Sequence, residues 1–506
     1  MKLFTIGDSL SQGFMSGAAA RTDLSFSTLI ADALKTSKYN YPEWPKGGHP
    51  LNIEQAFRVL ERRFGDDEDI RGPFEWTRAL SILNSYMDNV EDYYEREGGN
   101  DPNFKSFFHN VAVRGFDLSS AWQVNPELCS KLINQSRNSS RDNFPSVVDQ
   151  SFLRTARTVL RAGSKGNQNF SQLDWLNHHH KEEGVENLIL FLGANNALGT
   201  VLSLNINQTS RNGTAFKDGP ESVSYETRRD KGWNLWHPDD FRVEYRFTLN
   251  RVKKILQSNP DVDYKVFVAT IPLVTIAPLI KAVGAVNERQ QVEVTEYRMD
   301  NVQAAPKSKA ELPKAEKIKY SYAKYYTYFP FADSFDIEDP HLNFRQILHI
   351  DNCIRTYNRI IQEEVMAFNK SLNARKVYIV DVGTILSKMA LKRNNLMPPY
   401  EYPEYFDFVY PRIDTRYYGT TRDGKIMSGG IFSLDGVHPS AIGQGLLAYE
   451  FLKVMNEAGS FDGDPEKALN WDAIFESDSL YNDPIGLLNE IYDNAKLARW
   501  MLGKLS

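Results

Sequence analysis

The chain starts with Lys2-Leu-Phe-Thr-Ile6, an apolar run that leads directly into Gly7-Asp8-Ser9-Leu10-Ser11. A short apolar run without alternation is typical of a parallel strand that is buried on both faces. Ligands of open α/β sheets bind beyond the carboxyl ends of such strands, so Ser9 lies where a nucleophile is expected. A turn serine has many structural roles, however, and Ser9 needs chemical partners from elsewhere in the chain.

Four further apolar runs share the composition of the first one. They are Phe107–Val113, Asn187–Leu192, Lys265–Ile271 and Lys376–Val382. Helical periodicity follows or precedes several of them, at Ser25–Lys35, from Asp239 or Asp240 as N-cap to Leu256, at Gln346–Phe368 and at Ser440–Met455. This alternation predicts an α/β fold in which a parallel sheet of about five strands lies between helical layers.

The segments between the predicted strands are too long to be simple crossovers. Because the candidate chemistry is split between the two ends of the chain, we expect one framework domain, residues 1–456, with large insertions. The insertions are predicted near residues 36–106, 129–185, 203–238, 278–345 and 384–432. Residues 457–506 are predicted to form a helical C-terminal extension.

Composition narrows the class of protein. A net charge of −6 argues against nucleic acid as the main partner. The two cysteines, Cys129 and Cys353, exclude a disulfide-rich scaffold and leave room for one bridge. No apolar run reaches the roughly 18 residues of a membrane-spanning helix, so no transmembrane segment is expected. The oligomeric state stays open.

The expected location depends on the start of the chain. With Met1 as the native start, we expect a cytoplasmic protein, since Met1–Ile6 is too short for a signal sequence. A trimmed chain would allow export. Glycosylation sequons such as those at Asn134, Asn138, Asn207 and Asn212 matter only in that second case.

Near the far end of the chain, Asp435-Gly-Val-His438 supplies a carboxylate and an imidazole with two residues between them. A serine hydroxyl needs a base within hydrogen-bond reach, and the imidazole needs a group that fixes its other nitrogen. The pattern predicts Ser9 as nucleophile, His438 as general base and Asp435 as the orienting carboxylate. The Gly-x-Ser-x-Gly pentapeptide that marks α/β-hydrolases does not occur in the chain.

Four short blocks follow one another along the chain, each beside an apolar run or the last helix: Gly7–Leu10, Asn110–Gly115, Gly193–Asn196 and Asp435–His438. In this combination the framework resembles the SGNH hydrolases, also called the GDSL esterases and lipases. The resemblance implies a flavodoxin-like three-layer α/β/α fold and cofactor-independent hydrolysis of acyl esters.

The resemblance also implies an oxyanion hole made of the backbone N–H groups of Ser9 and Gly115 and the side-chain amide of Asn195. One position departs from the family pattern, because Asn196 stands where the family usually has Asp. We expect that change to affect the local turn rather than the chemistry.

Together these features predict a serine esterase or lipase that forms an acyl-enzyme intermediate on Ser9. Its substrate would be a small-molecule, lipid or carbohydrate ester, which the insertions would select. Two alternatives stay open: acyl transfer to an alcohol by the same triad, and a non-catalytic binding protein on the same framework.

Two further motifs have structural interpretations. Asp8 is predicted to form the turn before Ser9 rather than to act as an acid. His178-His179-His180 is predicted to be a solvated polar segment, because three adjacent side chains do not share a helix face and make poor ligands for one ion. No metal site is expected.

Overall fold

A parallel β-sheet of four strands forms the centre of the protein. The computed structural model describes residues 1–64, 73–96, 107–136, 148–160, 165–284, 290–297, 315–394, 398–410, 413, 418–420 and 426–487. The strands lie in the order β1 (Phe4–Gly7), β5 (Asn187–Phe191), β6 (Lys265–Ala269) and β12 (Val377–Val380). All neighbouring pairs are parallel. Four of the predicted strands and the α/β class are thereby confirmed.

The predicted strand Phe107–Val113 is wrong in extent, because it is reduced to a single bridge between Thr5 and Asn110. The segment still runs along the free edge of β1, and the N–H of Val111 donates to the Thr5 carbonyl at 3.1 Å. The side chain of Asn110 accepts the N–H of Ala112 at 3.0 Å. Such a side-chain turn bends the backbone away from a regular strand.

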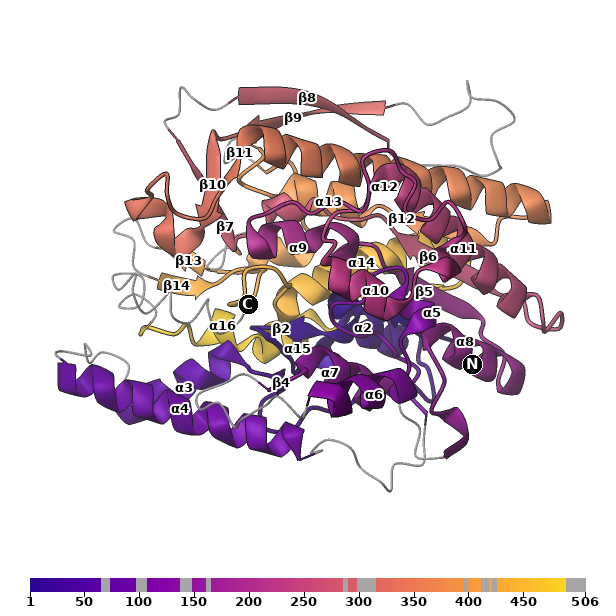
Figure 1. Ribbon diagram of the computed structural model, residues 1–506. Helices are drawn as coiled ribbons and strands as arrows, with labels where there is room; N and C mark the ends of the chain where they lie inside the picture. Colours follow the sequence, from indigo (N-terminus) through magenta and orange to yellow (C-terminus); the bar gives the residue numbers. More distant parts are fainter. Residues whose placement is uncertain are drawn as a thin grey trace.

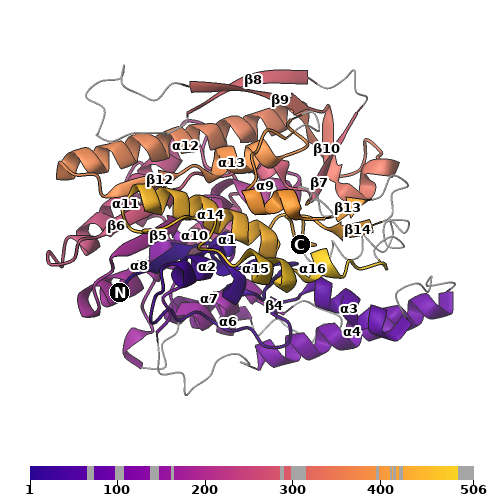
Figure 2. The same ribbon diagram turned by 180° about the vertical axis from the view of Figure 1, so that it is seen from behind.

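Helices cover both faces of the sheet (Figures 1 and 2). On one face α2 (Phe26–Ala33) packs against α14 (Ala441–Glu457), and Figure 2 shows this pair in front of the strands. On the other face α11 (Pro238–Leu256) packs between α8 (Gln172–Glu182) and α12 (Phe344–Leu372). The four helices expected from periodicity are all present.

The predicted start of α11 is wrong. Its N-cap is His237 and not Asp239 or Asp240, and the His237 side chain accepts the N–H of Asp239 at 3.2 Å. Pro238 is the first helical residue, a position that suits proline because an N–H there would have no acceptor within the helix. The carboxylate of Asp240 instead accepts a hydrogen bond from the Thr209 hydroxyl at 2.6 Å.

The segments between the framework strands form most of the other elements. Between β1 and β5 these are α1 (Ser9–Gln12), β2 (Phe14–Met15), β3 (Ala18–Ala19), β4 (His49–Pro50), α3 (Ile53–Phe64), α4 (Pro73–Glu95), α5 (Ser120–Gln123), α6 (Pro126–Ser136) and α7 (Ser151–Leu160). Further along are α9 (Asn195–Ser203), α10 (Tyr225–Lys231), β7 (Ile280–Val283), β8 (Gln290–Tyr297), β9 (Ala315–Tyr322), β10 (Tyr325–Tyr328), β11 (Leu342–Asn343), α13 (Val382–Met389), β13 (Tyr418–Thr420) and β14 (Ile426–Gly429).

The C-terminal extension packs against the first insertion. Its described part holds α15 (Trp471–Ser477) and α16 (Ser479–Asn482), while residues 488–506 lie outside the described residues. Leu480 and Ile485 join a hydrophobic cluster with residues of α3 and α4, the helix pair that projects at one end of the molecule in Figure 1. The described part of the C-terminal extension therefore packs on α3 and α4 of the first insertion.

Two expectations from composition can be compared with the structure. In the described part of the chain, no helix has the length and apolar character needed to cross a membrane. Cys129 and Cys353 are both buried and free, so they do not form the one bridge that composition allowed.

Candidate active site

Ser9 lies at the carboxyl end of β1, where the short helix α1 begins. Asp8 is the N-cap of this helix, and its Oδ1 accepts the N–H of Leu10 at 3.0 Å. The predicted role of Asp8 as a turn-forming residue is therefore confirmed. N–H groups in the first turn of a helix have no acceptor within the helix, so the N–H of Ser9 can serve a ligand.

The imidazole of His438 joins Ser9 to Asp435. Its Nε2 lies 2.8 Å from the Ser9 Oγ, and its Nδ1 lies 2.9 Å from an oxygen of Asp435. With its Nδ1 hydrogen donated to the carboxylate, the ring presents the Nε2 lone pair to the serine hydroxyl. The structure thus brings together the three residues that the sequence assigned to a triad.

Asp435 is held in its charged form. One of its oxygens accepts the N–H groups of Val437 and His438, each at 2.9 Å. Burial raises the pKa of Asp435, but the His438 imidazole and these two N–H groups outweigh burial and lower the pKa below its ordinary value. A permanent negative charge beside His438 keeps the ring in the orientation that a general base needs.

The turn at Ser16 and Gly17 fixes the loop that carries His438. The N–H of Gly17 donates to Asp435 at 3.0 Å, and Gly17 has a φ of +85°, which favours glycine. Ser433 Oγ accepts the N–H of Ser16 at 2.9 Å and donates to the His438 carbonyl at 3.1 Å. The sequence did not predict these contacts of Ser16 and Gly17 with the loop that carries His438. A glycine between two short apolar pairs indicates a tight turn, but it does not reveal a partner 418 positions away.

Asn195 lies beside Asp8 and against the segment that contains Gly115. Its Nδ2 donates to the Phe116 carbonyl at 2.9 Å and makes a longer contact of 3.3 Å with Asp8. Gly115 is exposed and has a φ of +75°. The two contacts together occupy the amide group of Asn195, and the contact with Asp8 is the longer of the two.

The charge of Asp8 bears on this arrangement. Burial raises the pKa of Asp8 to about 7, against the opposing effects of the Leu10 N–H and of His438. Below that pKa the carboxyl group is mostly neutral. A neutral carboxyl group beside Asn195 carries no negative charge that would repel an anionic oxygen at that amide.

Asn196, the departure from the family pattern, is fully buried in the first turn of α9. Its Oδ1 accepts the N–H of Leu118 at 3.2 Å, and its carbonyl accepts the N–H of Trp236 at 3.0 Å. Both contacts are to backbone groups, and the expected effect of this position on the local turn stays a prediction. These contacts of Asn196 connect the start of α9, which carries Asn195, to the segment after Gly115 and to the insertion that ends near Trp236.

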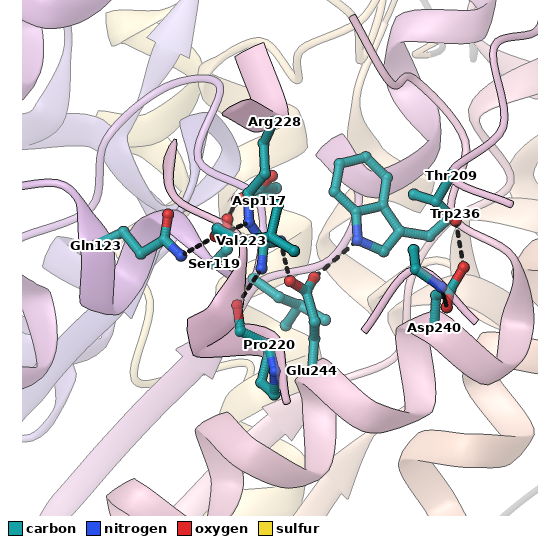
Figure 3. Close-up of polar contacts among 12 residues, drawn as sticks. Asp117, Ser119, Gln123, Thr209, Pro220, Val223, Arg228, Trp236, Asp240 and Glu244 are labelled. Atoms are coloured by element: carbon teal, nitrogen blue, oxygen red, sulfur yellow. Dashed lines mark hydrogen bonds and ion pairs between the residues drawn. The ribbon is translucent and has the colours of Figure 1, made fainter. Parts of the chain in front are cut away.

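A buried ion pair holds that insertion in place (Figure 3). The carboxylate of Glu244 accepts hydrogen bonds from the Arg228 guanidinium and, at 2.7 Å, from the Trp236 indole N–H. Arg228 also donates to the carbonyls of Pro220 and Val223. Burial raises the pKa of Glu244 to about 7, and Arg228 opposes this effect. Removing one member of a buried pair typically costs about 3–5 kcal/mol, so the network anchors Trp236 firmly.

A narrow cavity of about 50 Å³ opens beside Ser9. Asn195 and His438 border it together with the serine, and most of its remaining lining is apolar. The apolar side chains include Leu10, Leu198, Leu273, Val274, Ile276 and Phe432. The cavity thus places apolar walls directly next to the serine hydroxyl.

The prediction that His178-His179-His180 is solvated is wrong for two of the three residues. All three lie in α8, and His179 and His180 are 1% and 0% exposed. Helical periodicity places these two on the inner face of α8 with Leu176. The three histidines are adjacent in sequence, but a helix places adjacent side chains on different faces, so one of them is partly exposed and two are buried.

His179 belongs to the group of residues best placed to hold a metal ion in the described part of the chain. Together with His109 and Glu183 it offers ligand atoms that all lie within 4.8 Å of one another. The Nδ1 of His109, however, accepts the backbone N–H of Asn40 at 2.8 Å. The neutral ring must then carry its hydrogen on Nε2, which leaves no lone pair there for a cation. The group therefore does not fit a metal.

The candidate site thus combines a hydroxyl, an imidazole, a carboxylate and an apolar cavity at the carboxyl ends of the strands. Comparison with known proteins adds no relative: no family model, curated protein or solved structure matches the chain. Its function must be inferred from the geometry of the site.

Proposed function

We propose that the protein is a serine hydrolase that cleaves carboxylic esters through an acyl-enzyme intermediate. The observation that carries this proposal is the continuous line of hydrogen bonds from Asp435 through His438 to Ser9, with lengths of 2.9 and 2.8 Å. A base oriented by a carboxylate and in contact with a hydroxyl is the arrangement that activates serine.

In the proposed reaction, Ser9 Oγ attacks the ester carbonyl carbon while His438 Nε2 takes its proton. The N–H groups of Ser9 and Gly115 and the amide of Asn195 stabilise the negative oxygen that forms. His438 then gives its proton to the departing alcohol. A water molecule, deprotonated by His438, attacks the acyl-enzyme and releases the acid.

The strand order supports the finer family proposal. With the segment around Asn110 at the free edge of β1, the five strand-like segments lie across the sheet in the order second, first, third, fourth, fifth. This is the flavodoxin-like order. We therefore propose that the framework is an SGNH-type fold, with a catalytic site at the carboxyl ends of its strands.

Labelling with a fluorophosphonate, followed by peptide mapping, tests the proposal. We expect modification at Ser9 in the folded protein and none in Ser9→Ala or in heat-denatured protein. Ser11→Ala is a matched control, because Ser11 is also buried and its hydroxyl has no partner in the described part of the chain. This variant should be labelled like the wild type. Labelling at another residue, or no labelling, would contradict the mechanism.

A further inference from the structure

The cavity beside Ser9 is small. An apolar cavity of roughly 150 Å³ holds benzene, whereas this one measures about 50 Å³. By proportion it holds about two carbon atoms. A chain of six or more carbons would extend well beyond the cavity.

The lining of the cavity indicates which part of an ester enters it. Beyond Ser9, Asn195, His438 and Asp8, the side chains that line it are apolar. A sugar or another polar alcohol would lose its hydrogen bonds there, whereas a hydrocarbon chain would not. The alcohol part of the ester, which the cavity does not receive, then lies outside these apolar walls.

One wall of the cavity is a 3-10 turn, Val274–Ile276, with its neighbours Leu273 and Ala277. The ammonium group of Lys392 donates to the carbonyls of Thr275, Ala277 and Ile280 at 3.2, 2.8 and 2.7 Å. All three hydrogens of the ammonium group are thus used to hold this wall.

Two further contacts fix the same wall. The hydroxyl of Thr275 donates to Asp351 and accepts a hydrogen bond from Arg393, and these two charged side chains are fully buried. The N–H of Leu279 donates at 2.9 Å to the carbonyl of Gly436, in the loop that carries His438. Withdrawal of the wall would take from the Lys392 amine its three carbonyl acceptors, and from Asp351 and Arg393 one hydrogen bond each, which is costly for buried groups.

We propose that this cavity receives the acyl group of the ester, and that its fixed wall restricts the substrates to short acyl esters, above all acetyl esters. The inference rests on the proposed function. For an acetyl ester, the bond from the carbonyl carbon to Ser9 Oγ forms first and gives a tetrahedral intermediate, and the bond to the alcohol oxygen then breaks. The serine proton passes through His438 to the alcohol, and water then releases acetate.

The test compares p-nitrophenyl acetate, butyrate and octanoate, which share one leaving group. We expect kcat/KM to fall at least about tenfold from acetate to butyrate and further to octanoate, since one methylene beyond the size of a pocket costs about tenfold or more. Equal rates for acetate and octanoate would overturn the restriction. Ser9 labelling by the fluorophosphonate would still support the proposed function in that case, whereas no hydrolysis and no labelling would overturn both.

A matched pair of variants tests the wall itself. Ile276→Ala enlarges the cavity, whereas Ile280→Ala makes the same truncation at a buried residue of the same segment that does not line it. We expect Ile276→Ala to raise the butyrate-to-acetate ratio of kcat/KM about tenfold and Ile280→Ala to leave the ratio unchanged. Leu273→Ala is a second enlarging variant in case Ile276→Ala does not fold. Equal shifts in the enlarging and control variants would contradict the role of the wall.

Discussion

Two histidine–carboxylate pairs in this chain have nearly the same hydrogen bond and very different surroundings. The Nδ1 of His438 lies 2.9 Å from Asp435, and the Nδ1 of His179 lies 3.0 Å from Glu183. His438 faces the hydroxyl of Ser9 beside a cavity. His179 packs among aromatic rings instead, with the ring of Phe4 5.3 Å away.

The different surroundings show that a histidine–carboxylate pair is not sufficient for base catalysis. A carboxylate fixes an imidazole wherever the two meet, but base catalysis also needs a nucleophile at the second nitrogen and room for a substrate. Only the His438 pair has both in the described structure. The pair at His179 is accordingly assigned to packing of α8 against β1.

The largest expected effect comes from removing the partners of the first pair. Ser9→Ala and His438→Ala should each lower kcat/KM by about 10⁴-fold or more, because triad members act as a unit. For the same reason the double variant should be little worse than either single variant. Ester hydrolysis kinetics measure this. Losses that add in the double variant would contradict a shared mechanism.

Asn195→Ala tests whether this amide stabilises the negative oxygen. Loss of one such donor costs about 100- to 1000-fold in kcat, and KM should change little because the donor acts mainly in the transition state. Steady-state kinetics with an acetyl ester separate the two constants. A change confined to KM would show that Asn195 only binds the ground state.

Around the second pair, the free energy of unfolding should depend on pH, because His109 is buried beside His179. Burial lowers the pKa of His109, a neighbour of His179, from 6.5 to about 4. The unfolded chain therefore binds a proton as pH falls through 6.5, while the folded protein resists protonation down to pH 4, so stability falls over this range. Since one pKa unit corresponds to about 1.4 kcal/mol, the shift corresponds to about 3 kcal/mol.

His109→Asn isolates that contribution, because its Oδ1 can replace Nδ1 as acceptor for the N–H of Asn40. Urea unfolding from pH 7 to pH 4.5 should show a smaller loss of free energy of unfolding in the variant than in the wild type. Parallel losses would contradict a buried neutral His109.

The smallest effect is expected for His179→Phe. Phenylalanine keeps the packing with the surrounding rings and loses a hydrogen bond to the partly exposed Glu183, so the free energy of unfolding should change by less than about 1 kcal/mol. Ester hydrolysis should be unchanged. A large loss of activity in this folded variant would erase the distinction between the two pairs.

Sequence patterns predicted the features that local composition determines. The apolar runs located β1, β5, β6 and β12, and the spacing in Asp435–His438 located the hydrogen-bonded pair. The strand at Phe107–Val113 was overestimated because a side-chain hydrogen bond of Asn110 competes with regular pairing.

Features that depend on distant segments could not be predicted in this way. The burial of His180 depends on contact with α11, where its Nε2 lies 3.0 Å from the Leu256 carbonyl. Two other contacts also join segments far apart in the sequence. These are the hydrogen bond from Gly17 to Asp435 and the hydrogen bond from Lys392 to the carbonyl of Ala277 in the cavity wall. No local pattern records such a partner.

The contact between Ser9 and His438 joins residues 429 positions apart. During synthesis the ribosome releases Ser9 long before His438, so a growing chain carries a hydroxyl without its base. Under the proposed function, hydrolysis can begin only after the loop that carries His438 has reached the carboxyl end of β1. Ester hydrolysis would then report that the first and last parts of the framework have come together.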